Sequence, residues 1–312
     1  MKWARVGEGT QGSYAALVDG PDTIVLPDGR VLAFDDVGDP AGVPVVYLHG
    51  TPDSRLARHP DDGVAAAAGV RLVAVDRPGA GDSDPHPDGT LTSLGHDLAR
   101  LLDHLGVAEV ILLGWSAGAL CALAAATVLG DRVRATGLVT PIPPVEAYAD
   151  AALVAALGPG RRGFVEMALE VAPAVVAAEV VPYLVPQPLT PGQALEHVLG
   201  GAGERGRQEL AAVPGAAEQL ARALEASVSH GTGGIEHDIA LQLEAGLHLG
   251  AVTAPVRTFH GEDDGLSPPI VGAWLVSRLP NAVLDLSPEA GHHLLFPHWR
   301  GILRALRRDA AL

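Results

Sequence analysis

Short apolar runs alternate with helically spaced apolar residues through the first half of the chain. Leu91–Leu105 carries its apolar residues at helical spacing, and Ala117–Leu129 is rich in Ala and predicts a buried helix. Strands that are buried on both faces have continuous apolar sequences, and strands that alternate with helices form a parallel sheet covered on both faces. We therefore predict an α/β fold with a mostly parallel, doubly wound sheet of about eight strands flanked by helices. The apolar runs that predict its first parallel strands are Val43–Leu48, Arg71–Val75, Val110–Leu113 and Val133–Val139.

A different pattern precedes this alternation. Thr23–Leu26 and Val31–Val37 are joined at Asp28-Gly29, a dipeptide typical of tight hairpin turns. The sequence therefore predicts an antiparallel hairpin at the edge of the sheet.

The strand pattern is interrupted in the middle of the chain. Residues 145–250 have helical character with no clear strand, and strand patterns return at Pro255–Phe259 and Ala282–Leu286. The simplest interpretation is one α/β core, formed by residues 1–144 and 251–312, with a helical cap inserted into it. We expect this cap to act as a mobile lid that sets the substrate range, because its glycine clusters can serve as hinges.

Composition narrows the classes of partner. The formal net charge is −16, and an acidic surface repels nucleic-acid phosphates and anionic lipids. We therefore expect no nucleic-acid or membrane partner, but a small-molecule substrate bound by a monomer or homodimer. Hydrophobic residues make up 48% of the chain and aromatic residues only 4%, so the core and any pocket must be built mainly from Ala, Val and Leu.

The sequence also bears on the cellular setting. Cys121 is the only cysteine, which excludes an intramolecular disulfide and a multi-cysteine metal site. Met1–Thr10 lacks the apolar segment of a signal peptide, and no apolar run reaches the ~18 residues that span a bilayer. We therefore expect a cytoplasmic protein. The abundance of Gly, Ala, Pro and Arg, which have GC-rich codons, favours a bacterial source.

The pentapeptide Gly114-Trp115-Ser116-Ala117-Gly118 matches the G-x-S-x-G nucleophile elbow. An apolar strand precedes it and a helix follows it, which is the context that the elbow requires. The sharp turn strains the backbone at the serine, and side chains at the two glycine positions would clash there. The pattern therefore predicts Ser116 as a nucleophile at the carboxyl edge of the sheet, and we expect Trp115 to line the substrate pocket.

A serine hydroxyl needs a base held beside it, and the base needs an acid that orients it. After an elbow of this kind, the acid and then the histidine follow along the chain, each in a loop after a strand. Gly-x-x-Asp spacing favours Asp264 over Asp263 as the acid. The position directly after Gly291 favours His292 over His293 as the base.

The loop after the strand Val43–Leu48 has the sequence His-Gly-Thr-Pro. We predict that the backbone N–H groups of Thr51 and Ala117 bind the developing oxyanion, since two such donors lower the barrier by several kcal/mol. His49 is interpreted as a structural residue that bonds to backbone within the loop. The loop Asp76–Ser83 contains a lone G-x-G without the third glycine of a dinucleotide site, so it predicts a tight backbone turn near the active site and no cofactor.

Together these motifs resemble the α/β-hydrolase superfamily, in particular its capped esterase, lactonase, haloperoxidase-like and proline iminopeptidase-like members. The resemblance implies that residues 145–250 roof the pocket and that no cofactor is needed. Ser116 disfavours dehalogenases and epoxide hydrolases, which have aspartate at the elbow. Thr51 and Asp53 replace the second glycine run of typical proline iminopeptidases. The resemblance is carried by His49–Pro52, Asp76–Ser83, Gly114–Gly118, Gly261–Asp264 and Gly291-His292.

We therefore expect a serine hydrolase that cleaves an ester, thioester or lactone through an acyl-enzyme, with a small to medium, mostly apolar substrate. One alternative keeps the fold for carbon–carbon bond hydrolysis, lyase or cyclase chemistry, and another is a peptidase of the proline iminopeptidase type. A third is a ligand-binding protein without turnover. The complete predicted triad disfavours it, because a binding protein has no need for all three groups.

Overall fold

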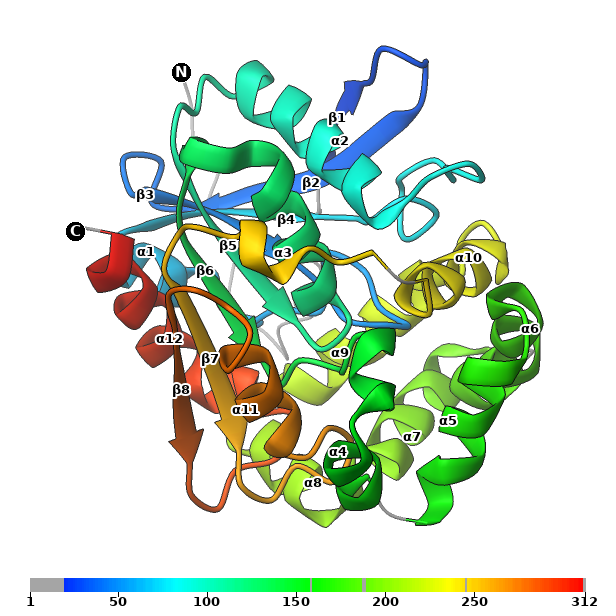
Figure 1. Ribbon diagram of the computed structural model, residues 1–312. Helices are drawn as coiled ribbons and strands as arrows, with labels where there is room; N and C mark the ends of the chain where they lie inside the picture. Colours follow the sequence, from blue (N-terminus) through cyan, green and yellow to red (C-terminus); the bar gives the residue numbers. More distant parts are fainter. Residues whose placement is uncertain (1–19, 158, 187–188, 245, 311–312) are drawn as a thin grey trace, which may run out of the picture.

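The computed structural model describes residues 20–157, 159–186, 189–244 and 246–310. Its centre is an eight-stranded sheet with the order β1-β2-β4-β3-β5-β6-β7-β8 (Figure 1). The strands are β1 (Asp22–Val25), β2 (Val31–Gly38), β3 (Val43–Leu48), β4 (Val70–Val75), β5 (Val110–Trp115), β6 (Val133–Val139), β7 (Val256–Gly261) and β8 (Ala282–Ser287). Strand β2 is antiparallel to both β1 and β4, and the other neighbouring pairs are parallel. The predicted sheet and its edge hairpin are confirmed.

Different helices cover the two faces of the sheet. They are α1 (Gly63–Ala67), α2 (Leu91–His104), α3 (Gly118–Leu129), α11 (Ile270–Val276) and α12 (Leu295–Ala310). Successive side chains of a strand point to opposite faces. Val46 and Leu48 of β3 belong to the buried cluster that includes α2, α3 and α11, whereas Val45 and Tyr47 belong to the cluster that includes α1 and α12. All four side chains are fully buried, which explains the continuous apolar sequence of this strand.

Between β6 and β7, the described residues form helices and connecting turns. These elements are the 3-10 helices η2 (Val145–Ala149) and η3 (Leu249–Ala251), and the α-helices α4 (Ala151–Ala156), α5 (Pro159–Glu170), α6 (Pro173–Leu184), α7 (Pro191–Gly201), α8 (Gly203–Ala211), α9 (Ala216–Ser227) and α10 (Gly233–Gln242). Helices α5, α6, α7 and α10 lie together to one side of the sheet (Figure 1). They share an apolar cluster of their own, which includes Val176, Ala194 and Ile239.

Helix α8 and one side of α9 pack differently. Leu210 of α8 and Leu220 and Ala223 of α9 belong to the same buried cluster as Trp299 of α12. The other side of α9, with Leu224, contacts the separate cluster of α5, α6, α7 and α10. Two helices of the inserted segment are thus built into the packing of the sheet. The predicted division of the chain into core and cap, and the motion of the cap as a lid, remain predictions.

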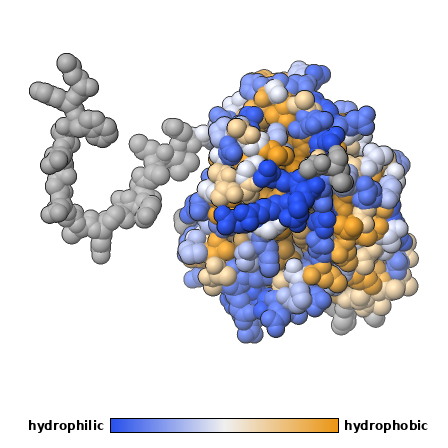
Figure 2. Space-filling view, turned by 90° about the vertical axis from the view of Figure 1, so that its left-hand side faces the viewer, coloured by the Kyte–Doolittle hydropathy of each residue, from blue (hydrophilic) through white to orange (hydrophobic). Residues whose placement is uncertain are grey.

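The outer surface reflects the polar part of the composition. Figure 2 shows the side on which α1, α12 and β8 lie, where hydrophilic residues cover much of the face and hydrophobic residues form smaller patches between them. None of the described helices combines the length and the hydropathy needed to cross a lipid bilayer. Met1–Thr10, on which the expectation about a signal peptide rests, lies outside the described residues.

Candidate active site

Ser116 occupies the sharp turn between β5 and α3. Its φ angle is +55°, a region that non-glycine residues rarely adopt. A Cβ atom on Gly114 would lie 2.2 Å from the carbonyl oxygen of Gly118, and a Cβ atom on Gly118 would lie 2.2 Å from that of Leu48. Both glycines are therefore required by the close approach of three backbone segments. The helix predicted to start at Ala117 begins one residue later, and Ala117 is its N-cap.

The structure brings the three predicted catalytic side chains into one hydrogen-bonded line. His292 Nε2 lies 3.1 Å from Ser116 Oγ, and His292 Nδ1 lies 2.9 Å from Asp264 Oδ2. Ser116 follows β5, Asp264 follows β7 and His292 follows β8. Because these parallel strands end at the same edge of the sheet, their loops meet there. This arrangement can pass a proton from Ser116 to His292 while Asp264 orients the ring, although the catalytic roles remain predictions.

The two adjacent aspartates have different surroundings. Asp264 is 4% exposed, and its Oδ1 accepts hydrogen bonds from the N–H groups of Leu266 and Ser267 at 2.8 Å each. Burial alone would raise the pKa of Asp264, but the adjacent His292, the N–H of Ser267 and the nearby His260 outweigh it and hold the pKa below its usual range. The side chain of Asp263 is instead half-exposed at the surface.

The backbone of His292 is held as firmly as its ring. Its carbonyl oxygen accepts hydrogen bonds from Trp115 Nε1 at 3.1 Å and from Thr140 Oγ1 at 3.2 Å. Trp115, predicted to line the pocket, does border a cavity beside Ser116, but it is only 3% exposed. Most of its indole ring therefore packs against the histidine loop.

His293, the histidine not chosen as the base, lies behind Trp115 with its ring centroid 6.0 Å from that of the indole. Burial lowers the pKa of His293 to about 3, and the neighbouring His292 contributes to this effect. Its imidazole is thus neutral at physiological pH and a poor proton acceptor. Among the described residues, nothing hydrogen-bonds to its Nδ1 atom.

The predicted oxyanion donors border the same cavity as the nucleophile. Thr51 and Ala117 line this cavity together with Ser116. Within the described part of the chain, no acceptor takes the backbone N–H of Thr51 or of Ala117. Two unclaimed N–H groups beside a nucleophile are what an oxyanion site requires. Among the described residues, His49 bonds to backbone atoms alone: to the carbonyl of Gly50 within its own loop, as predicted, and to the N–H of Arg77 in the loop after β4.

Side chains that the sequence analysis did not identify hold Thr51 in place. Its hydroxyl accepts hydrogen bonds from Arg77 Nη2 at 2.8 Å and Gln242 Nε2 at 3.0 Å. The same hydroxyl donates to Asp238, which also forms an ion pair with Arg77. Asp238 and Gln242 are 187 and 191 residues from Thr51 in the chain. Their spacing of four residues on one helix was the only signal of a shared role.

The loop Asp76–Ser83, predicted as a tight backbone turn near the active site, makes a close backbone contact with α10. Gly79 has a φ of +81°, and a Cβ atom on Gly234 would lie 2.2 Å from the carbonyl oxygen of Gly79. The first turn of α10 therefore rests directly on this loop.

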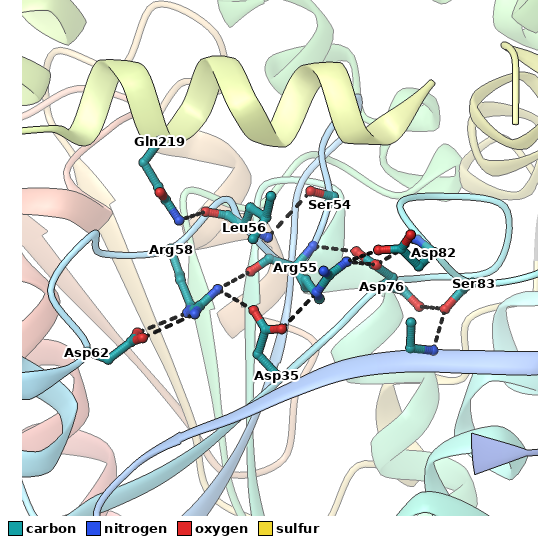
Figure 3. A network of polar contacts seen from close by, with 11 residues as sticks. Asp35, Ser54, Arg55, Leu56, Arg58, Asp62, Asp76, Asp82, Ser83 and Gln219 are labelled. Atoms are coloured by element: carbon teal, nitrogen blue, oxygen red, sulfur yellow. Dashed lines mark hydrogen bonds and ion pairs between the residues drawn. The ribbon is translucent and has the colours of Figure 1, made fainter. Parts of the chain in front are cut away.

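Figure 3 shows how the loop after β3 is tied to the sheet. The Arg55 guanidinium donates to the carboxylates of Asp35, Asp76 and Asp82. The backbone N–H of Arg55 also donates to Asp76, at 2.7 Å. From above, Gln219 of α9 donates to a backbone carbonyl of the same loop at 2.9 Å. This network gives the segment that carries the predicted oxyanion donor a rigid support.

Two cavities meet at Ser116. One has a volume of about 290 Å³, is bordered by Thr51 and Ala117, and is lined mainly by apolar side chains. The other has a volume of about 380 Å³ and is bordered by Trp115 and His292. Two cavities that share the nucleophile suit a substrate with groups on both sides of the bond to be cleaved.

The second cavity contains an unusual acid, Asp53. No donor in the described part of the chain hydrogen-bonds to its carboxyl group, which borders the cavity. Burial raises the pKa of Asp53 to about 8, and the nearby charge of Arg77 offsets only part of this effect. The carboxyl group is therefore mostly protonated at neutral pH.

The wild-type protein is expected to lose stability as the pH rises, because Asp53 is protonated in the folded state. Asp53→Asn should not show this loss. Between about pH 4 and pH 8 the folded state keeps a proton that the unfolded state releases, so stability falls across this window. The shift amounts to about four pKa units. Because Asp53 is partly exposed to the cavity, we count about half of it, which corresponds to about 2.7 kcal/mol, or roughly 5 °C in Tm. Thermal unfolding across this pH range checks it.

In that experiment, the Tm of Asp53→Asn minus that of wild type should be near zero at the acidic end and positive above the pKa of Asp53. Asp22→Asn, at an exposed position of β1, is the control that removes one charge without burial. A Tm difference for Asp53→Asn that stays constant with pH contradicts the assignment.

The sheet, the elbow and the Ser-His-Asp line define an α/β hydrolase with a serine at the nucleophile position. A family model described as alpha/beta hydrolase fold matches residues 43–298, and the chain therefore belongs to the α/β-hydrolase family. This confirms the resemblance seen in the sequence.

Individual relatives match over different lengths. A proline iminopeptidase from Xanthomonas citri is 37% identical over 109 residues, which are 33% of each chain. The chain thus matches about a third of the length of such curated relatives. An esterase from Rhodococcus superposes with a TM-score of 0.65 at 24% identity, over 94% of this chain and 99% of the other. A bromoperoxidase from Bacillus anthracis gives a TM-score of 0.62 at 19% identity, over 91% and 96%. The two structural similarities show the fold alone.

Proposed function

We propose that the protein is a carboxylester hydrolase, acting on an ester, thioester or lactone through an acyl-enzyme. The observation that carries this proposal is the continuous hydrogen-bonded line from Asp264 through His292 to Ser116, at a cavity that also receives two unclaimed N–H groups. Acyl transfer needs these parts together: a nucleophile, a base with its orienting acid, and an oxyanion site.

The steps follow from the positions of these groups. Ser116 Oγ attacks the carbonyl carbon, and His292 Nε2 accepts the hydroxyl proton while the N–H groups of Thr51 and Ala117 bind the oxyanion. The protonated His292 then donates this proton to the leaving-group oxygen or sulfur as its bond to the carbonyl carbon breaks. Water repeats the sequence on the acyl-enzyme and releases the acid, and Asp264 stabilises the imidazolium in both halves.

The first cavity supports an apolar, medium-sized acyl group. Its volume of about 290 Å³ is at the small end of the range for ligand pockets. The apolar side chains that line it come from both the core loops and the inserted helices: Ile142, Pro143, Tyr148, Leu157, Phe164, Val165, Val180, Leu184, Ile239, Leu243 and Leu266.

Narrowing this cavity is expected to shift the acyl-chain preference. Val180→Phe on α6 should lower kcat/KM for octanoyl p-nitrophenyl ester by about tenfold or more relative to the acetyl ester, because a misfit of one or two methylenes costs ~1–3 kcal/mol. The change should lie mainly in KM. A panel of acetyl to decanoyl esters measures it, with Val175→Phe, at an exposed position of the same helix, as the control.

The same panel tests the proposed function itself. Wild type should hydrolyse at least one ester with a rate that fluorophosphonate abolishes. No turnover on any oxygen ester, thioester or lactone would leave the ligand-binding and carbon–carbon alternatives. Equal losses for all chain lengths in Val180→Phe would contradict the placement of the acyl group.

A second candidate is aminopeptidase activity on a free N-terminus. The 37% identity to a proline iminopeptidase favours it, and Asp53 provides a cavity-lining carboxyl group that could pair with an ammonium. Prolyl p-nitroanilide added to the ester panel discriminates between the two, since a peptidase of this type should cleave it faster than an uncharged acyl anilide.

A further inference from the structure

Glu209 of α8 contacts the histidine loop on both sides of its central residue. Glu209 Oε1 accepts a hydrogen bond from the N–H of Gly291 at 2.6 Å, and Oε2 accepts one from the N–H of His293 at 3.0 Å. A single carboxylate thus spans the two peptide N–H groups that flank His292. Charge-assisted bonds of this kind are about twice as strong as neutral ones.

The approach of α8 to this loop is close and depends on small residues. A Cβ atom on Gly291 would lie 2.8 Å from Arg205 Cγ, and one on Gly206 would lie 2.6 Å from His293 Nδ1. Arg205 also forms an ion pair with Asp263 at 3.0 Å, next to the predicted acid. One helix therefore touches both loops that carry the acid and the base.

The carboxylate of Glu209 is shielded from solvent. Glu209 as a whole is only 7% exposed. Burial raises the pKa of Glu209, while the N–H groups of Gly291 and His293 oppose this effect. The charges of His292 and Asp264 also act on it.

We propose that Glu209 is a positioning residue for the hydrolysis, which rests on the proposed function. It fixes the backbone on either side of His292, so that Nε2 stays within hydrogen-bond reach of Ser116. Trp115 and Thr140 hold the carbonyl of the same residue, so the loop is held at the N–H groups of Gly291 and His293 and at the carbonyl of His292. Because α8 lies in the inserted helical segment, catalysis requires that this segment packs correctly against the histidine loop.

Replacing Glu209 tests the proposal. Glu209→Ala is expected to lower kcat for a butyryl ester by about 100-fold with little change in KM, because a misplaced catalytic group costs about this factor. Glu209→Gln should lose about tenfold, since its amide keeps one acceptor but turns a donor toward the second N–H. Glu204→Gln is the matched control: it removes one charge from an exposed position of α8 and should leave kcat unchanged.

Chemical rescue separates positioning from general stability. Formate is small enough to enter the space that Glu209→Ala leaves and can accept both N–H groups. We expect formate to restore kcat of Glu209→Ala several-fold and saturably, with no effect on wild type or Glu204→Gln. Wild-type kcat in both Glu209 variants would overturn the proposal. So would a loss in proportion to unfolded protein, measured by Tm and circular dichroism, without rescue.

The rate constant of fluorophosphonate labelling keeps this test independent of the substrate. Labelling of Ser116 needs the base but no particular acyl group, so it should slow in the Glu209 variants in parallel with kcat. If wild type labels at Ser116 but cleaves no ester, the proposed function fails while the role of Glu209 is still measured. If labelling is equally fast in all variants, the role of Glu209 fails while ester hydrolysis stands.

Discussion

Ser116→Ala is expected to lose about 10⁶-fold in kcat, the typical cost of removing the nucleophile from a triad of this kind. The hydroxyl contributes one side-chain hydrogen bond, to His292, so the variant should fold normally. The measurements are ester turnover, the mass shift on fluorophosphonate labelling, and Tm. Labelling should add one phosphonyl group to wild type and none to the variant.

Two results would contradict the assignment of Ser116. One is labelling at another serine, and the other is substantial activity in a folded Ser116→Ala protein. Ser277→Ala is the control for a serine replacement that should change neither readout. Ser277 is the C-cap residue of α11, and among the described residues its hydroxyl bonds only to its chain neighbours Trp274 and Arg278.

Asp264→Asn is expected to lose about 10⁴-fold in kcat, whereas Asp263→Asn should stay within a few-fold of wild type. The carbonyl of the introduced amide would still accept the N–H groups of Leu266 and Ser267, which places its NH₂ group against His292 Nδ1. The ring would then carry its proton on Nε2 and could not accept one from the serine. Asp263→Asn loses only a half-exposed ion pair, which is worth ~0–1 kcal/mol.

The pair of aspartate variants is its own matched control, because each replaces one carboxylate by an amide at adjacent positions. Equal losses of kcat, or a larger loss in Asp263→Asn, would mean that Asp264 is not the residue that orients His292. If neither variant loses activity, the acid lies elsewhere. Glu146, shortly after β6, would then be the next candidate, and its carboxylate accepts a hydrogen bond from the N–H of Gly246 at 2.7 Å.

The sequence predicted the framework of this molecule because short-range physics determines it. A strand buried on both faces must be apolar throughout. For this reason the apolar runs predicted β3 and β6 with the bounds that the structure shows, Val43–Leu48 and Val133–Val139. A strand-to-helix turn as tight as the one at Ser116 has room for hydrogen alone at Gly114 and Gly118. The order of serine, acid and histidine came from the pattern that accompanies such an elbow, and parallel strands that end at one edge bring the three loops together.

The sequence could not assign the partners of the inserted helices. Helical periodicity indicates which face of α8 is buried, and Glu209 lies on that face beside Leu210, but it does not say what that face meets. Gly291 and His293 are 82 and 84 residues away. The same limit applies to Asp238 and Gln242 of α10, whose contacts with Thr51 depend on where the helix packs.

The sequence by itself therefore determined the α/β sheet, the nucleophile elbow and the candidate triad, because each follows from a local steric rule or from strand order. Only the tertiary structure decided that α8 and α9 share the core of the sheet, that Glu209 braces the histidine loop, and that the carboxyl group of Asp53 is desolvated beside the nucleophile. Burial and long-range hydrogen bonds arise from the packing of segments far apart in the chain. No pattern within one segment specifies the charge, the distance or the dielectric surroundings that another segment will bring to it.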